Sequence, residues 1–256
     1  MNDTQSTPSG GQRPDYSDEI SLVDLVATFI RRRRFFYVVF LTVTLAGLAY
    51  ALWMPDKYEY ASLVQIAQKD NNEFVQPPET VIATLESRWL PEVKALHREN
   101  HGTKLPFDVS FSNPESTGLI RFSSNSTKKE EKTVGAAHSS LIGSVKDHQE
   151  VLIAGERQSL QRQIASLEKA IETLKGEKDA GEAIASAIER RSRLEAKLEG
   201  LQGVEVLVTS RRSAEKVAPK RSLIVVLSLL LGSMLGIFVA FMSEFAATVR
   251  AQFATE

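Results

Sequence analysis

The chain has 256 residues, a net charge of −1 at pH 7 and no cysteine. Without cysteine it has no disulfide, no thiolate metal ligand and no cysteine nucleophile. Between Asp56 and Arg221 the sequence carries 25 Lys and Arg residues and 25 Asp and Glu residues. This balance lacks the basic surface that nucleic-acid binding needs, so we expect no nucleic-acid partner.

Residues 1–34 are predicted to form a cytoplasmic tail that ends in a helix on the membrane surface. Residues 1–17 are rich in Ser, Thr, Pro, Gly and Gln, a composition typical of disordered chains. From Leu22 to Ile30 apolar residues recur at helical spacing and form one face of a helix. Four basic side chains follow, and we expect them to bind anionic lipid and to hold this end in the cytoplasm: Arg31, Arg32, Arg33 and Arg34.

Two apolar segments, residues 35–54 and residues 221–243, predict transmembrane helices. No side chain is charged in the first segment, or in the second from Leu223 to Ser243. Twenty residues of helix extend about 30 Å, the thickness of the hydrocarbon core of a bilayer. We expect residues 55–220 to form one domain between the spans, and residues 244–256 to form a second cytoplasmic tail.

A stripe of small residues runs along the second span. Such a stripe lets the backbone of another helix approach closely, although glycine is also simply common in spanning helices. We favour the packing interpretation and expect the stripe to join spanning helices in a homo-oligomer. Its members recur at every fourth position: Ser228, Gly232, Gly236 and Ala240.

The segment between the spans predicts an α+β domain. Aromatic and β-branched residues favour a strand over 58–67. Apolar residues alternate with polar ones, as in half-buried strands, over residues 107–111, 120–122 and 204–208.

Helical spacing of apolar residues from Val81 to Leu96 predicts two short helices that are interrupted at Pro91 and cover the sheet.

The longest helical pattern, over about residues 127–201, predicts a helical hairpin arm. Its tip lies between Gly176 and Gly181, where the pattern is interrupted. Glycines within the first helix leave two alternatives open, a continuous helix and a bent or broken one. Apolar residues spaced four and three apart form a coiled-coil seam, which we expect to pack arms together: Leu160, Ile164, Leu167, Ile171 and Leu174.

The sequence offers little that would support catalysis, and we predict a protein without enzymatic activity or cofactor. His97 and His101 are four residues apart, as in a zinc-binding pair, but no third ligand is suggested and we favour a solvated helix end. His138 and His148 are ten apart and do not converge on one helix face. Neither the phosphate-loop motif nor the G-x-S-x-G nucleophile motif occurs.

Three segments resemble the polysaccharide co-polymerases, the chain-length determinant proteins of bacterial O-antigen and related glycans. They read DEISLVDLVATFIRRRRFF before the first span, MPDKYEYASLVQIA after it, and APKRSLIVVLSLLLGSMLGIFVAF at the second. The most specific part is the motif of Pro219, Lys220 and Arg221 before a glycine-striped helix.

This resemblance implies a bacterial inner-membrane protein that spans the membrane twice, with both termini cytoplasmic and a periplasmic α+β domain. It implies a homo-oligomer that sets the length of a surface glycan, O-antigen or another lipopolysaccharide or exopolysaccharide. Its partners would be membrane lipids, a separate glycan polymerase and the growing lipid-linked polysaccharide. A separate partner kinase stays open.

Two features argue for alternatives. Basic residues cluster before the second span, from Arg211 to Arg221, and taken alone they favour the opposite orientation. The domain between the spans is short for an O-antigen member of the family, which keeps an exopolysaccharide or capsule system open. A periplasmic sensor or membrane adaptor that signals through a partner is the second functional class, and a membrane enzyme with an unfamiliar site is the third.

Overall fold

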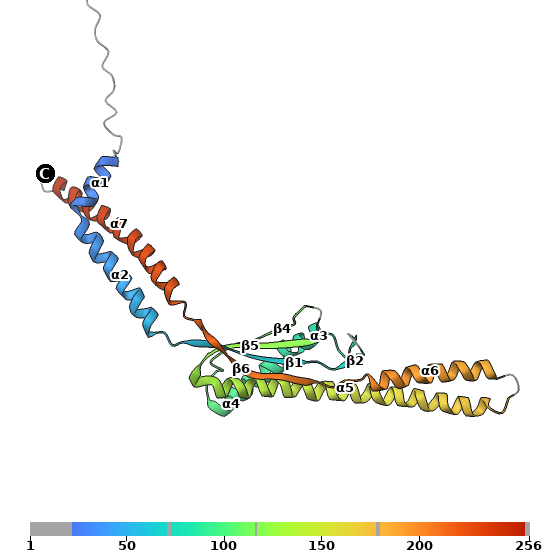
Figure 1. Ribbon diagram of the computed structural model, residues 1–256. Coiled ribbons are helices and arrows are strands. Elements are labelled where there is room, and N and C mark those ends of the chain that lie inside the picture. Colours follow the sequence, from blue (N-terminus) through green and yellow to red (C-terminus); the bar gives the residue numbers. More distant parts are fainter. Residues whose placement is uncertain (1–21, 71–72, 116, 178–179, 254–256) are drawn as a thin grey trace, which may run out of the picture. The chain divides into compact units, whose positions relative to one another are not determined.

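The computed structural model describes residues 22–70, 73–115, 117–177 and 180–253 (Figure 1). The chain divides into two compact units. One contains the residues up to Met54 and those from Lys220 onward, and the other is Pro55–Pro219. The predicted disordered tail, residues 1–17, lies outside the described residues.

The first unit is built from three helices, α1 (Leu22–Arg31), α2 (Arg33–Trp53) and α7 (Arg221–Phe253). α2 and α7 are long and apolar enough to cross a membrane by their length and composition. They pack against each other along their length. α7 continues about ten residues beyond the span expected from the sequence and ends near the described C-terminus.

The second unit contains a four-stranded antiparallel sheet with the order β4-β5-β1-β6. Its strands are β1 (Lys57–Gln65), β4 (Val109–Ser112), β5 (Leu119–Thr127) and β6 (Glu205–Ala218). All four strand patterns found in the sequence therefore belong to one sheet. A small ribbon, β2 (Gln68–Asp70) with β3 (Glu73–Phe74), was not predicted.

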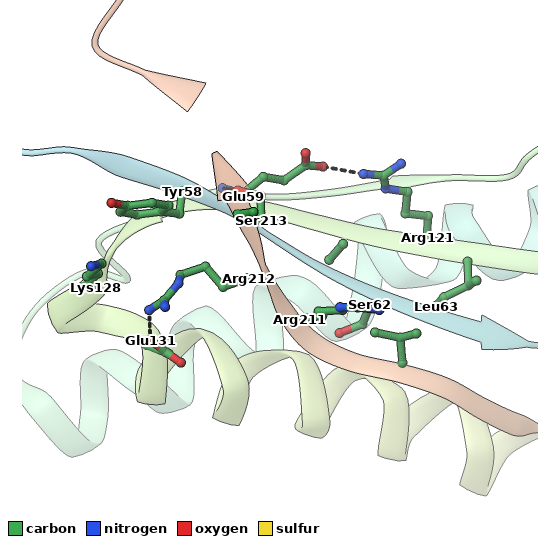
Figure 2. A pocket seen from close by; sticks show the side chains of 13 residues that line it. Tyr58, Glu59, Ser62, Leu63, Arg121, Lys128, Glu131, Arg211, Arg212 and Ser213 are labelled. Atoms are coloured by element: carbon green, nitrogen blue, oxygen red, sulfur yellow. Dashed lines mark hydrogen bonds and ion pairs between the residues drawn. The ribbon is translucent and has the colours of Figure 1, made fainter. Parts of the chain in front are cut away.

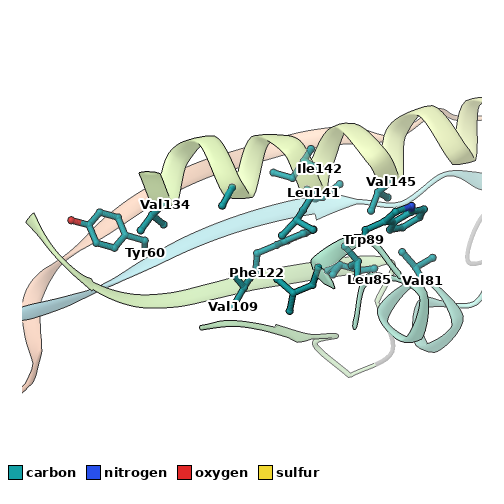
Figure 3. Packing of buried hydrophobic residues seen from close by; sticks show 14 of the residues in the cluster. Tyr60, Val81, Leu85, Trp89, Val109, Phe122, Val134, Leu141, Ile142 and Val145 are labelled. Atoms are coloured by element: carbon teal, nitrogen blue, oxygen red, sulfur yellow. The ribbon is translucent and has the colours of Figure 1, made fainter. Parts of the chain in front are cut away.

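One face of this sheet is the core of the unit. In β1 and β5 every second side chain is buried, because successive residues of a strand point to opposite faces. Phe122 of β5 is fully buried and stacks edge-on against Phe111. The helix α5 (Glu131–Leu174) lies across this face and contributes Val134, Leu141 and Val145 (Figure 3).

The helices between β3 and β4 complete the core, and here the predicted interruption at Pro91 is wrong. α3 (Pro78–Thr84) continues through a π-helical turn, Leu85–Trp89, directly into α4 (Leu90–His101). Pro91 is the second residue of α4, which follows the π-helical turn directly. The π-helical turn places Leu85 and Trp89 in the core.

The predicted arm is a helical hairpin, formed by α5 and α6 (Gly181–Glu199). Of the two alternatives for its first helix, the structure has the continuous one. Its 44 residues extend about 66 Å. Gly143 and Gly155 both lie inside this helix, and a methyl group added at either position would meet open space.

Gly155→Ala is expected to stabilise α5 by about 0.5–1 kcal/mol, because alanine loses less backbone entropy than glycine in a helix. The measurement is the urea midpoint of the full chain in detergent micelles. Gly102→Ala is the control with the opposite sign, because Gly102 ends α4 with φ = 68°, a left-handed conformation that alanine adopts at a cost. The prediction would be contradicted if Gly155→Ala did not raise the urea midpoint or if Gly102→Ala did not lower it.

Candidate functional site

The small-residue stripe of α7 faces α2 of the same chain. A Cβ atom built on Gly232 would lie 3.2 Å from the carbonyl oxygen of Phe40, and one on Gly236 would lie 2.8 Å from Cδ2 of Phe36. At Ser228 the partner is Gly47, where a Cβ atom would overlap the serine side chain. Ala240, the last member of the stripe, is fully buried. The stripe thus packs α7 closely against another helix, and that helix, α2, belongs to the same chain.

Charged residues tie the two ends of this helix pair. Glu244 of α7 accepts hydrogen bonds from Arg32 Nε at 2.7 Å and from Arg31 Nη1 at 3.1 Å. At the opposite ends, Arg221 Nε donates to the carbonyl oxygen of Ala51 at 3.1 Å. A cation suits this position because the last carbonyls of a helix carry partial negative charge.

The four arginines that were expected to orient the protein differ in their contacts. Arg31 and Arg32 both form ion pairs with Glu244. Arg33 and Arg34 are exposed and form no ion pair within the described part of the chain, so they stay available to anionic lipid. In the motif before α7, Lys220 is exposed, and Pro219 is buried and follows a cis peptide bond.

The apolar seam of α5 faces α6. Leu160 and Ile171 are buried, and the other three members, Ile164, Leu167 and Leu174, are half-buried. The seam therefore packs the two helices of one hairpin, and packing between arms of different copies stays a prediction. Other apolar side chains of the arm remain exposed, Val151 at 71% and Ile188 at 46%.

A polar cluster that the sequence did not reveal lies between the sheet and α5. His138 is fully buried there, with Nδ1 2.8 Å from Ser62 Oγ and Nε2 2.9 Å from Ser124 Oγ. Burial lowers the pKa of His138 from 6.5 to about 4, because the protonated ring would lose its hydration. Ser62 also accepts a hydrogen bond from the backbone N–H of Ser210 at 2.7 Å, so this cluster anchors β6.

β6 is strongly irregular where it pairs with β1. Its fourteen residues pair with the nine of β1, and the register shifts at four points. Ser210 has φ = 45°, a left-handed conformation that is rare outside glycine. Bulges of this kind turn side chains away from strict alternation and are common next to functional sites.

A groove opens beside these bulges, with a volume of about 680 Å³ (Figure 2). We call it the β6 groove. This volume is in the range of small-molecule sites. Its lining comprises apolar or small side chains (Ala61, Leu63, Val208, Ala214), hydroxyl groups (Tyr58, Ser62, Ser213) and charged groups (Glu59, Arg121, Lys128, Glu131, Arg211, Arg212).

Two ion pairs fix the walls of the β6 groove. Arg121 Nη2 lies 2.7 Å from Glu59 Oε1, and Arg212 Nη1 lies 2.8 Å from Glu131 Oε2 (Figure 2). A hydrogen bond from Ser123 Oγ, together with Arg121, lowers the pKa of Glu59 despite its partial burial. The carboxylate of Glu59 is thus held in its ionised form at neutral pH.

Cations also surround the ring of Tyr58. Lys128 Nζ and Arg212 Cζ each lie 5.4 Å from the ring centroid, within cation–π distance. In the sequence, the Arg211 and Arg212 doublet was interpreted only as a topology signal. On the bulged strand Arg211 pairs with Ala61 and Arg212 with Tyr60, and the guanidinium of Arg212 lies over the ring of Tyr58. This position depends on strand pairing that sequence periodicity does not show.

The histidine pair on α4 is present but isolated. The rings of His97 and His101 stack at 4.4 Å. Within the described residues, no group of three or more His, Asp or Glu side chains could hold a metal ion.

Together these features define an α+β domain with a helical arm, inserted between two apolar helices that are long enough to cross a membrane. The model of the family "Wzz: Chain length determinant protein" matches residues 18–92. This stretch contains α1, α2, β1, β2, β3 and α3 and ends in the first turn of α4. Over these residues the chain is similar to that family, and the predicted resemblance is confirmed.

A solved structure described as "full-length bacterial polysaccharide co-polymerase" shares 15% identity, with a TM-score of 0.45, over 89% of this chain and 99% of that chain. No curated protein sequence matches the chain.

Proposed function

We propose that the protein regulates the chain length of a bacterial surface polysaccharide that a separate polymerase synthesises. The observation that carries this proposal is the family match over residues 18–92. The two apolar helices support placement in the inner membrane as a protein that spans it twice. On this proposal both termini are cytoplasmic, the α+β domain is periplasmic, and the glycan is O-antigen or a related lipopolysaccharide or exopolysaccharide.

A protein that regulates a polymerase without catalysing a reaction can act as a scaffold for it. We infer that several copies of this chain assemble to form that scaffold. β6 is an edge strand of fourteen residues, so one row of its backbone groups has no strand partner among the described residues. Val206 and Leu207 on this strand are more than 40% exposed. Together with the exposed apolar residues of the arm they form surface that a second copy would bury. The assembly would contact the polymerase and the lipid-linked polysaccharide.

Deleting the gene in its native host is expected to abolish the modal length of the surface polysaccharide. Gel electrophoresis resolves the length distribution in the wild type, the deletion strain and the complemented strain. A band cluster that becomes random on deletion and returns on complementation supports the proposal. Total polysaccharide is the control, because a regulator changes the distribution whereas a missing enzyme changes the amount.

An unchanged distribution in all three strains would contradict length control. Co-purification of a signalling protein with the chain would then support the sensor or adaptor function.

A further inference from the structure

The β6 groove carries more positive than negative charge. Four cationic side chains and two carboxylates line it, which leaves a net charge of +2. The chain from Asp56 to Arg221 is balanced in charge, so this excess is local. Glu59 and Glu131 already neutralise Arg121 and Arg212 through their ion pairs.

The remaining two cations have no carboxylate partner. Neither Lys128 nor Arg211 lies within ion-pair distance of an Asp or Glu among the residues that the structure describes. Lys128 is instead held over the ring of Tyr58. A charge that is positioned in this way but not neutralised favours an anionic ligand.

The geometry also argues against a neutral sugar as the preferred ligand. Sugars bind aromatic rings through the ring face, and the face of Tyr58 is approached by Lys128 and Arg212. Guanidinium groups match the oxygens of a phosphate in pairs, and the groove contains three of them. Ala61, Leu63 and Val208 also line the groove and provide apolar surface for the group that carries the phosphate.

We propose that the β6 groove binds a phosphate or diphosphate group, with Lys128 and Arg211 as its main cationic contacts. The ligand is an organic phosphate, because the groove is larger than a simple ion needs and part of its lining is apolar. The phosphate could be borne by a lipid or by a soluble compound. The chain joins β1 directly to α2 and β6 directly to α7, and these two helices are long and apolar enough to cross a membrane. For this reason the experiments below include a lipid that carries a phosphate.

The test is a calorimetric titration of the full chain, in maltoside micelles that contain no phosphate, with inorganic pyrophosphate at low salt. Saturable binding is expected, and it should weaken as NaCl is added. Lys128→Glu with Arg211→Glu changes the groove from +2 to −2 and should weaken binding by about tenfold or more. Arg211→Lys keeps the charge but loses the fork, so it should give an intermediate affinity.

The matched control is Arg98→Glu with Lys104→Glu. It makes the same change of charge at two exposed positions outside the groove, and neither residue forms an ion pair in the described chain. It should retain wild-type affinity. Circular dichroism establishes that both double variants fold. Equal weakening in the two double variants would show a general charge effect and would overturn the proposal, as would no binding of pyrophosphate and phosphatidic acid to the wild type.

A second titration separates the two sources of phosphate. Mixed micelles with phosphatidic acid are compared with mixed micelles that contain phosphatidylcholine. Selective binding of phosphatidic acid, in competition with pyrophosphate and lost in the Lys128 and Arg211 double variant, assigns the groove to a lipid-borne phosphate. Binding of pyrophosphate alone assigns it to a soluble phosphate compound. Both titrations use purified protein and no polysaccharide, so their outcome is independent of the proposed length control.

Discussion

Acidification from pH 7 to pH 4 is expected to destabilise the α+β domain by about 3 kcal/mol through His138 alone. The reason is the pKa of His138, which burial lowers from 6.5 to about 4. Between these values the unfolded chain binds a proton at this site and the folded chain does not. The contribution of the neutral ring is fully present above pH 6.5 and is lost as the pH falls towards 4.

The measurement is the free energy of unfolding in urea at several pH values between 4 and 7.5. Trp53 and Trp89 are the two tryptophans, and Trp53 is 91% exposed, so Trp53→Phe leaves the buried Trp89 as the reporter. The fluorescence of the folded protein is measured separately for the urea titration at each pH, because the ring of His148 lies 5.7 Å from that of Trp89.

His138→Gln should remove this part of the pH dependence, because glutamine keeps hydrogen-bonding groups but does not titrate. His101→Gln is the matched control at an exposed histidine, and this variant should keep the pH dependence of the wild type. Glu59 and Glu130 have lowered pKa values through hydrogen bonds, so they also lose stabilisation as the pH falls below about 4.5. They are present in all variants and cancel in the comparison. Equal pH dependence in wild type and His138→Gln would contradict this account.

Gly232→Leu with Gly236→Leu is expected to separate α2 from α7 by about 2 Å, the difference between close and wide helix packing. The backbone of α2 leaves no room for a leucine, because a Cβ atom on Gly232 would lie 3.2 Å from the carbonyl oxygen of Phe40 and one on Gly236 would lie 3.1 Å from that of Phe36. Spin labels at the exposed positions Leu48 and Leu227 would report a longer and broader distance distribution by double electron–electron resonance.

Ala246→Leu is the control, because it adds a side chain of the same size at an exposed position of α7. It should leave the label distance unchanged. The mass of the assembly in micelles distinguishes a stripe that packs helices of one chain from a stripe that joins different copies. A lower mass with an unchanged label distance would show that the stripe joins different copies, as the sequence suggested, and would contradict its role within the chain.

Local patterns of the sequence predicted the elements of this fold well. The charge-free runs indicated both long apolar helices, alternation indicated the strands, and the spacing from Leu160 to Leu174 indicated the hairpin. Each of these signals depends on which side of one element is apolar. They do not say which neighbour covers that side, so α2 of the same chain was not identified as the partner of the stripe, and the seam was expected to pack arms together although α6 of the predicted hairpin covers it.

The β6 groove and the His138 cluster could not be predicted for the same physical reason. His138 lies in a helix with many polar residues, and its burial follows from the position of α5 over β1 and β5. The groove depends on a fourteen-residue strand paired with a nine-residue one. Pairing across about 150 residues of sequence is decided by tertiary packing.

Polysaccharide synthesis in a reconstituted membrane tests the central claim most directly. The polymerase of the native host is placed in vesicles with and without this protein, and the lengths of the products are measured. We predict the same total incorporation of sugar in both, with a modal length only when the protein is present, and no incorporation by the protein alone. Identical length distributions with and without the protein would contradict its role as a regulator of chain length.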